Sequence, residues 1–171
     1  MVENMTQKIS KLTTNLWFNN QAEEAANFYT SVFPNSRIGK VTRYGEMKHE
    51  LEGLTKGDVM TIEFTLEGQN FVGLNGGPQY QFTEAISFII NCDSQEEVDY
   101  YWGKLTEGAD EKHQVCGWLK DRFGVSWQVV PTVLNELLTD SNSDKVERVT
   151  AAMFQMKKLN LHQLLQAYNA I

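Results

Sequence analysis

Residues 116–131 read CGWLKDRFGVSWQVVP, two short apolar runs separated by a polar turn at residues 120–124. Aromatic and β-branched residues predominate in both runs, which predicts two strands joined as a hairpin. Side chains of the second strand alternate between two faces: Val125, Trp127 and Val129 on one, Ser126, Gln128 and Val130 on the other. A strand with apolar residues on both faces is expected to be buried on both. The amide of Gln128 must then find hydrogen-bond partners or a ligand, which makes it the most informative polar residue of the chain.

The length and composition are those of one compact domain over residues 1–171, with 42% hydrophobic and 22% charged residues. The net charge of −7, without a cluster of Lys and Arg, argues against nucleic acids and membranes as partners. No apolar run approaches the roughly 20 residues of a membrane span, and the first 11 residues lack the apolar core of a signal peptide. Cys92 and Cys116 match no C-x-x-C pattern and are expected to be reduced thiols. We therefore expect a cytoplasmic protein.

Residues 8–76 have the pattern of a strand, a helix and three further strands. Helical spacing of apolar residues predicts the helix, which Pro34 ends, and Asn20 with Glu23 is predicted to form a capping box at its start. Alternating or continuous apolar residues predict the strands over 11–18, 37–44, 58–66 and 71–74. A hairpin turn at residues 67–70 joins the last two strands.

The same order begins again over residues 84–131, after the loop at residues 75–78. An apolar strand is expected over 85–92, then a helix with Ser94 and Glu97 as its capping box, then a short strand around Gln114 before the hairpin. An internal repeat of this length constrains the fold more than any single motif. It predicts an α+β fold in which two βαβββ units form one curved, mostly antiparallel sheet of about eight strands. The helices are expected outside this sheet and a concave pocket inside it.

Residues 132–171 have a helical pattern and are predicted to form a C-terminal helical extension. One helix is expected over 133–138, a second is predicted to be capped by Ser143, and a third starts at Asn160. Met153 and Met156 lie on the apolar face of the second helix, where a packing role is expected. The extension is expected to pack against the outer layer of the sheet or against a partner subunit.

Several segments carry a family resemblance: residues 16–18, 22–25, 28–29, 75–78, 85–88, 116–131 and 156–159. They span nearly the whole chain, which resembles the PhnB-like branch of the vicinal-oxygen-chelate superfamily of glyoxalases, bleomycin-resistance proteins and dioxygenases. Members of this branch are also filed as 3-demethylubiquinone-9 3-methyltransferase-like proteins. The resemblance implies a homodimer and a pocket for a small molecule. The extension also offers apolar helix faces that a dimer can bury.

The superfamily implies a metal site with one ligand near the end of the first strand and one on the last strand of each unit. In this chain the corresponding positions are residues 13–15, Leu74 or Asn75, residues 85–87 and Gln128. Metal-binding members carry His or Glu there, and hydroxyl or amide groups are poor substitutes. None of the histidines His49, His113 and His162 has a second His or a carboxylate at a ligating spacing in its own element, and each is expected to be a surface or capping residue. We therefore predict no cofactor, and a divalent metal is disfavoured.

A methyltransferase reaction receives little support from the sequence. Gly76 and Gly77 precede a proline rather than a helix, so no Gly-rich strand-to-helix turn cradles a nucleotide-bearing cofactor. No Ser/His/Asp or Cys/His set is readable at a fixed spacing, and no catalytic residue is assigned.

The binding candidates are aromatic and polar residues of the predicted strands, which could line a small apolar pocket. They are Asn15, Trp17, Glu63, Asn75, Ser87, Trp118, Trp127 and Gln128. Our first hypothesis is a metal-free protein of the bleomycin-resistance kind that binds a small apolar or aromatic compound. The alternative is a metal-dependent enzyme of the glyoxalase, dioxygenase or isomerase type, or the methyltransferase of the branch label. A third possibility is a scaffold whose pocket has no ligand.

Overall fold

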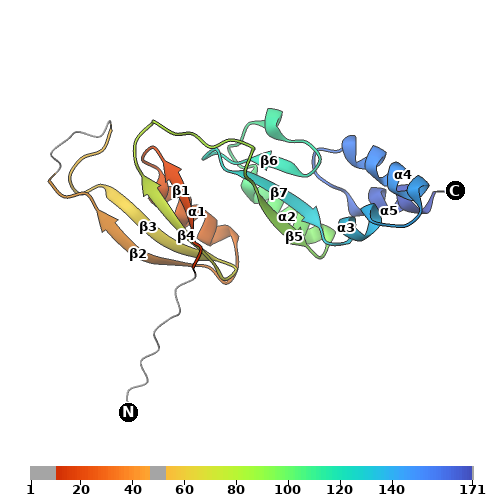
Figure 1. Ribbon diagram of the computed structural model, residues 1–171, viewed down its shortest axis with the longest axis horizontal. Helices are drawn as coiled ribbons and strands as arrows, with labels where there is room; N and C mark the ends of the chain where they lie inside the picture. The colour runs from red at the N-terminus through yellow and green to blue at the C-terminus, as the bar shows by residue number, and fades with distance from the viewer. Residues whose placement is uncertain (1–10, 47–52, 171) are drawn as a thin grey trace, which may run out of the picture. The chain divides into compact units, whose positions relative to one another are not determined.

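The computed structural model describes residues 11–46 and 53–170. The chain divides into two compact units, with the boundary between Gln81 and Phe82, and each unit is described by itself (Figure 1). Within the described residues, no helix combines the length and the apolar character needed to cross a membrane.

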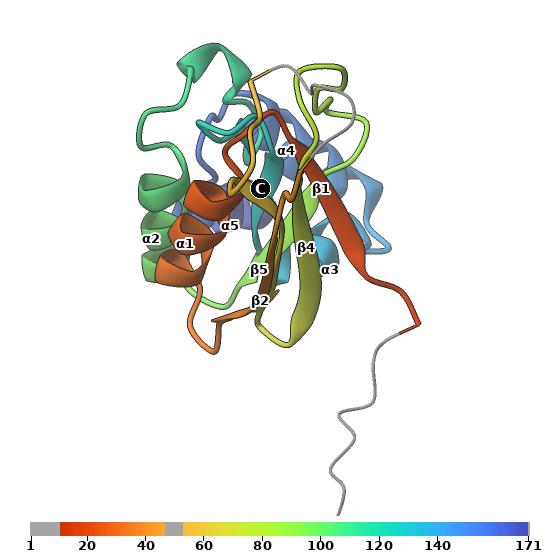
Figure 2. The same cartoon turned by 90° about the vertical axis from the view of Figure 1, so that its left-hand side faces the viewer.

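The first unit is a four-stranded sheet with one helix along a single face (Figure 2). Its elements are β1 (Thr14–Phe18), α1 (Ala22–Val32), β2 (Arg37–Arg43), β3 (Val59–Leu66) and β4 (Gln69–Asn75). The strand order is β1-β4-β3-β2, in which only the β1–β4 pair is parallel. Alternate side chains of the strands fill the core beneath α1, where Phe64 stacks on Phe71 at 5.2 Å between ring centroids. The predicted order of one strand, one helix and three strands is therefore confirmed.

The start of α1 differs from the prediction. The N-cap residue is Gln21, and no side chain of the preceding residues caps the helix. Instead, Oδ1 of Asn75, at the end of β4, accepts a hydrogen bond of 2.8 Å from the backbone N–H of Ala22. The predicted capping box of Asn20 and Glu23 is wrong, because the sheet supplies the oxygen that a local side chain usually supplies.

The second unit has a three-stranded sheet of order β5-β7-β6. Its elements are β5 (Phe88–Cys92), α2 (Gln95–Leu105), the 3-10 helix η1 (Glu111–His113), β6 (Trp118–Lys120) and β7 (Ser126–Pro131). Ser94 caps α2 as predicted, since its hydroxyl accepts from the backbone N–H of Glu97, while the Glu97 carboxylate accepts from that of Asp93. The buried side chains of α2 and of the sheet pack together in one core.

The short strand predicted around Gln114 is reduced to one bridge between Val115 and Trp118. Cys116 and Gly117 both have positive φ, 51° and 82°, and turn the chain directly into β6. Positive φ at both central residues is the geometry of a two-residue hairpin, so the pairing begins only one residue before the turn. The described strands accordingly form two sheets of four and three strands rather than one sheet of about eight. The α+β class with curved sheets from two units is confirmed.

Residues 132–170 form the helices α3 (Val133–Leu138), α4 (Ser143–Phe154) and α5 (Leu161–Asn169). They share a core of Leu134, Leu137, Val149, Leu159 and Leu164, against which Met153 and Met156 pack as predicted. Asn160 caps α5, whereas the cap of α4 is Asn142, one residue before the predicted Ser143.

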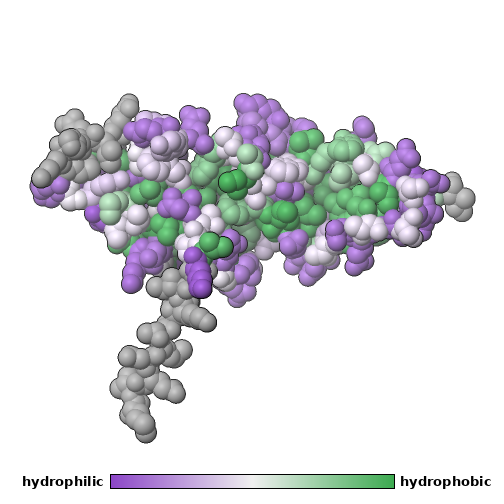
Figure 3. All heavy atoms as spheres, in the orientation of Figure 1, coloured by the Kyte–Doolittle hydropathy of each residue, from purple (hydrophilic) through white to green (hydrophobic). Residues whose placement is uncertain are grey.

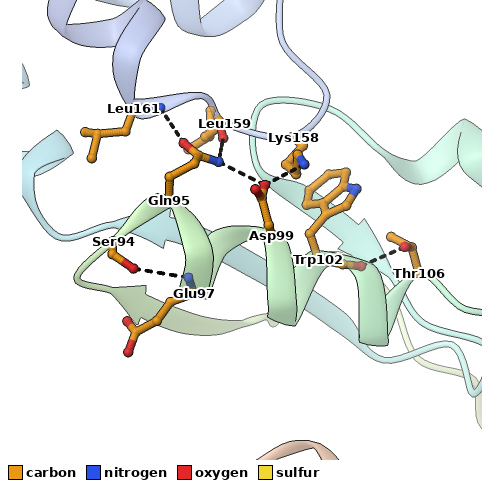
Figure 4. Close-up of polar contacts among 9 residues, drawn as sticks. All are labelled: Ser94, Gln95, Glu97, Asp99, Trp102, Thr106, Lys158, Leu159 and Leu161. Atoms are coloured by element: carbon orange, nitrogen blue, oxygen red, sulfur yellow. Dashed lines mark hydrogen bonds and ion pairs between the residues drawn. The ribbon is translucent and has the colours of Figure 1, made fainter.

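The segment between α4 and α5 fastens this extension to α2 (Figure 4). The amide of Gln95 accepts from the backbone N–H of Leu161 at 2.7 Å and donates to the carbonyl oxygen of Leu159 at 3.2 Å. One turn further along α2, the carboxylate of Asp99 pairs with Lys158 at 2.5 Å. The first turns of α2 therefore contact both the backbone of the extension, through Gln95, and one of its side chains, through Asp99.

Candidate functional site

Each sheet has a second face, opposite the helix of its own unit, which we call its open face. In the first unit, Leu16 and Phe18 of β1 are buried toward α1, so Asn15 and Trp17 lie on the open face. The strand register places Asn15 opposite Val72 of β4, and Val72 opposite Glu63 of β3. Three of the predicted binding residues, Asn15, Trp17 and Glu63, therefore share one open face.

Trp17 is held in place by the loop that follows β4. Its indole Nε1 donates to the carbonyl oxygen of Gly77 at 2.9 Å, and its ring meets Tyr80 edge to face at 4.9 Å. A Cβ atom on Gly76 would lie only 2.2 Å from the Trp17 ring, so a glycine is required there. The indole is thus a fixed, half-buried aromatic surface on the open face of the first sheet.

Three further predicted residues meet on the open face of the second sheet. Gln128 of β7 lies opposite Trp118 of β6 and beside Ile89 of β5. Its Nε2 donates to Oγ of Ser87 at 2.9 Å. Within the described part of the chain, no hydrogen-bond partner is found for its Oε1. Trp118, Ser87 and Gln128 are all half-buried, so an aromatic ring and an amide oxygen are both accessible on this face.

The other two predicted binding residues lie in the cores. Asn75 is 3% exposed, and its side-chain Nδ2 donates to the carbonyl oxygen of Val59 at 3.0 Å in addition to its bond with Ala22. Trp127 is 3% exposed and donates its indole N–H to Oδ2 of Asp121 at 2.8 Å. Both polar groups are satisfied by the fold itself, so neither residue is carried into the site proposed below.

Sequence reasoning missed a group of charged residues at the second open face. Glu84 Oε1 lies 2.6 Å from Nζ of Lys120 and 3.4 Å from Nδ1 of His113. The hydrogen bond from Lys120 holds the pKa of the Glu84 carboxyl below its ordinary value. His113 was expected to be a surface or capping residue, and its side chain is 29% exposed and lies against a carboxylate from another segment. The three residues come from different segments, so no spacing within one element could have revealed them.

The buried hydroxyl of Ser126 adds a second unexpected feature. Ser126 lies directly opposite Lys120 in the strand register and is 2% exposed. Its Oγ has no hydrogen-bond partner within the described residues. Because a buried polar group without a partner costs free energy, an unsatisfied hydroxyl is an uncommon feature of a strand.

The residues at the four superfamily metal positions do not fit a divalent transition metal. Asn75 is engaged in the first core, and Gln128 is bonded to Ser87. Such a metal requires imidazole or anionic donors. In the described ranges, no three His, Cys, Asp or Glu side chains lie close enough together to hold one ion.

The two cysteines are free thiols in the structure. Cys92 is buried in the core beneath α2, and this burial raises the pKa of its thiol to about 12. Because only the thiolate is nucleophilic, Cys92 is inert near neutral pH.

A separate cavity of about 280 Å³ lies at the start of α1 in the first unit. Its wall includes Asn20, Glu23, Arg43 and Asp58. Arg43 lies 4.0 Å from the carboxylate of Glu23 and donates to the carbonyl oxygen of Gly57. Of the predicted binding residues only Asn75 reaches this wall, so the cavity is distinct from the two open faces.

Comparisons with known proteins agree with this architecture. The family model of 3-demethylubiquinone-9 3-methyltransferase matches residues 10–130. The PhnB protein from Bacillus cereus is 34% identical, with a TM-score of 0.60, and the match covers 71% of this chain and 99% of that one. A search among curated proteins gave no match.

Two more distant structures share the fold. One is a protein from Pseudomonas aeruginosa, with 20% identity, a TM-score of 0.54 and coverage of 71% of this chain and 96% of that one. The other is the fosfomycin resistance protein FosX from Mesorhizobium loti, with 14% identity, a TM-score of 0.52 and coverage of 82% and 100%. Since the family model covers well over half of the sequence, the chain belongs to the 3-demethylubiquinone-9 3-methyltransferase family, the PhnB-like branch of the vicinal-oxygen-chelate superfamily.

Proposed function

We propose that this protein binds a small aromatic compound on the open face of its second sheet, without a metal ion. The observation that carries the proposal is the pair of Ser87 and Gln128 beside Trp118. The indole offers a flat apolar surface, and the amide oxygen of Gln128 offers an unused acceptor that fixes the orientation of a ligand. Asn15, Trp17 and Glu63, on the open face of the first sheet, are kept as candidate binding residues of the first unit by itself.

Binding rather than metal-dependent catalysis is favoured by the donor chemistry. Hydroxyl and amide groups at the superfamily positions offset the dehydration of a divalent ion poorly. Chelator should accordingly leave the melting temperature of the purified protein unchanged, because removal of a ligand that binds only the folded state would lower it. About one metal ion per chain, lost in chelator together with stability, would favour the enzyme alternative instead.

The experiment that tests the binding function directly is native mass spectrometry of the protein taken from its host. A small molecule retained by the native chain should be lost from Gln128→Ala, which removes the acceptor on the open face. Gln166→Ala is the matched control, because Gln166 is an exposed residue of α5. Equal retention by both variants would contradict a site at Gln128.

We also propose that the protein is a homodimer. Ile86 and Phe154 of the second unit are 75% and 63% exposed, and Figure 3 shows apolar surface over the part of the chain that contains this unit. Exposed apolar patches of this kind are often covered by a second copy of the chain. Sedimentation equilibrium at micromolar concentration should give twice the chain mass of 19.5 kDa, and a monomer would contradict the proposal.

A further inference from the structure

The cavity at the start of α1 combines a buried apolar lining with charged side chains. Its volume of about 280 Å³ lies at the lower end of the roughly 300–1,000 Å³ that is typical of small-molecule sites. Leu54 and Val59 line it and are each 5% exposed. Glu23, Arg43 and Asp58 add three charges to the same wall. A cavity of this size and lining suits a small molecule that carries charges of its own.

The guanidinium of Arg43, at the end of β2, keeps most of its hydrogen-bond donors available. Its Nη1 donates to the carbonyl oxygen of Gly57 at 3.0 Å. Its Nη2 lies 4.0 Å from Oε1 of Glu23, which is longer than the roughly 2.7–3.2 Å of a hydrogen bond. No other acceptor for Arg43 is found in residues 11–46 and 53–170. Because a guanidinium can bind a carboxylate through two parallel hydrogen bonds, Arg43 can hold the carboxylate of a ligand.

The carboxylate of Asp58 is held in a fixed orientation by the turn that precedes β3. Its Oδ2 accepts from the backbone N–H of Thr55 at 2.7 Å and from the Thr55 hydroxyl at 3.0 Å. Among the residues that the structure describes, its Oδ1 has no hydrogen-bond partner. The side chain is half-buried, so Oδ1 is an oriented acceptor for a cationic group.

Glu23, in the first turn of α1, supplies the second carboxylate of the wall. The only charged group near it in the described part of the chain is Arg43, at 4.0 Å. The other described residues of the lining are uncharged, so two carboxylates and one guanidinium leave one net negative charge. A ligand that matches these groups one by one carries one carboxylate and two cationic groups.

We infer that this cavity binds a basic α-amino acid. Arg43 binds the carboxylate of the ligand, while Asp58 and Glu23 bind its two cationic groups. The side chains of Arg43 and Glu23 are 55% and 50% exposed, so water weakens their interactions and the affinity is modest. All of these residues belong to the first unit, so the site is independent of the ligand face that we propose on the second sheet.

Isothermal titration calorimetry of the full-length protein with L-lysine tests the site. We expect one saturable site per chain with a dissociation constant of about 0.1–1 mM. L-norleucine lacks the side-chain ammonium group and 1,5-diaminopentane lacks the carboxylate. Each should bind about tenfold more weakly than L-lysine, because each leaves charged groups of the wall unmatched. If the diamine bound as tightly as L-lysine, the cavity would attract any cation and the inference would be wrong.

Variants of the wall then locate the binding. Arg43→Gln and Asp58→Asn should each weaken L-lysine binding about tenfold. The asparagine keeps an acceptor for Thr55, so the turn is preserved. The matched controls are Arg37→Gln, at an exposed position of the same strand outside the cavity lining, and Asp93→Asn, at an exposed position of the second unit. Both controls should bind L-lysine as the native chain does.

Circular dichroism checks that each variant is folded, and the three ligands on the native protein decide the matter if one is not. Unchanged affinity in folded Arg43→Gln and Asp58→Asn overturns the inference. So does the absence of saturable binding by the native protein up to about 10 mM L-lysine. Either result leaves the ligand face of the second sheet standing, because that face is tested separately at Gln128.

Discussion

The two units begin their helices in different ways, although they follow the same order of elements. In the second unit, Ser94 and Glu97 lie next to the backbone groups that they bind. In the first unit, the first N–H of α1 is bound by Asn75, which comes from the last strand of that unit. A local cap can form as soon as its helix forms, whereas the cap of α1 exists only when β4 is in place. The start of the first helix is therefore coupled to the closure of its sheet, and that of the second is not.

The largest effect is expected from Asn75→Ala. The substitution leaves the backbone N–H of Ala22 and the carbonyl oxygen of Val59 without their partner inside the first core. Two unsatisfied buried groups should lower the free energy of unfolding by about 2–4 kcal/mol. Urea denaturation measures this loss. Asn160→Ala, which removes the local cap at the start of α5, is the control and should cost about 1 kcal/mol. A smaller loss for Asn75→Ala than for the control would contradict the coupling.

A second, somewhat smaller effect is expected from Gly76→Ala. The added methyl group would lie 2.2 Å from the Trp17 ring, so the indole must leave its place between Gly76 and Tyr80. Overpacking of this kind costs about 1–3 kcal/mol. Gly103→Ala in α2 is the matched control, because its methyl group meets nothing within 4 Å and replaces a glycine inside a helix. This control should gain about 1 kcal/mol, so thermal melts should shift in opposite directions.

Ser94→Ala tests the local cap directly. The substitution removes the hydroxyl that accepts from the backbone N–H of Glu97 and should cost about 1 kcal/mol. Ser94→Asp, which keeps an acceptor and adds a negative charge at the helix start, should preserve the stability. If Ser94→Ala destabilised the chain as strongly as Asn75→Ala, the contrast between a local and a distant cap would disappear.

The smallest effect concerns the attachment of the extension to α2. The hydrogen bond from Lys158, and after it that from Gln95, lowers the pKa of Asp99 in the folded protein. The ionised carboxylate therefore stabilises the fold at a pH above the pKa of Asp99 in the unfolded chain. This stabilisation is lost as the pH falls through the lower pKa of the folded protein. Because the pair is exposed, the effect should be less than about 1 kcal/mol. Asp99→Asn should show a smaller loss of stability below about pH 4 than the native chain. Glu147→Gln, at an exposed site of α4, controls for the loss of one charge.

The elements of the fold were largely predictable, because each depends on patterns within a few residues. The hairpin around Gly124, the capping box at Ser94 and the helices of the extension all follow from local spacing. The cap by Asn75 was not predictable, since a distant oxygen replaces a local one. The strand expected around Gln114 does not form, because the turn at Cys116 and Gly117 leaves only Val115 to pair with the strand that follows.

The candidate site was predictable in part. Ser87 and Gln128 were named from the superfamily positions and Trp118 as a candidate pocket wall, and the structure places Gln128 opposite Trp118 and bonds it to Ser87. Alternation put Trp127 and Gln128 on opposite faces of their strand but could not tell which face is buried beneath a helix, so Trp127 was included among the candidates. The contacts of Glu84 with His113 and Lys120 depend on how three segments meet in space, and no periodicity encodes them.

The bonds that fasten the extension to α2 also set an order for folding during synthesis. Every contact described for the first unit is made within the first 81 residues, including the cap of α1 by Asn75, so this unit is complete once residue 81 leaves the ribosome. The second unit must wait for Leu159 and Leu161, near the end of the chain, before Gln95 has its partners. Domains that emerge first generally fold first. The second unit is then the last part of the protein to be completed, and it is the unit in which we place the ligand.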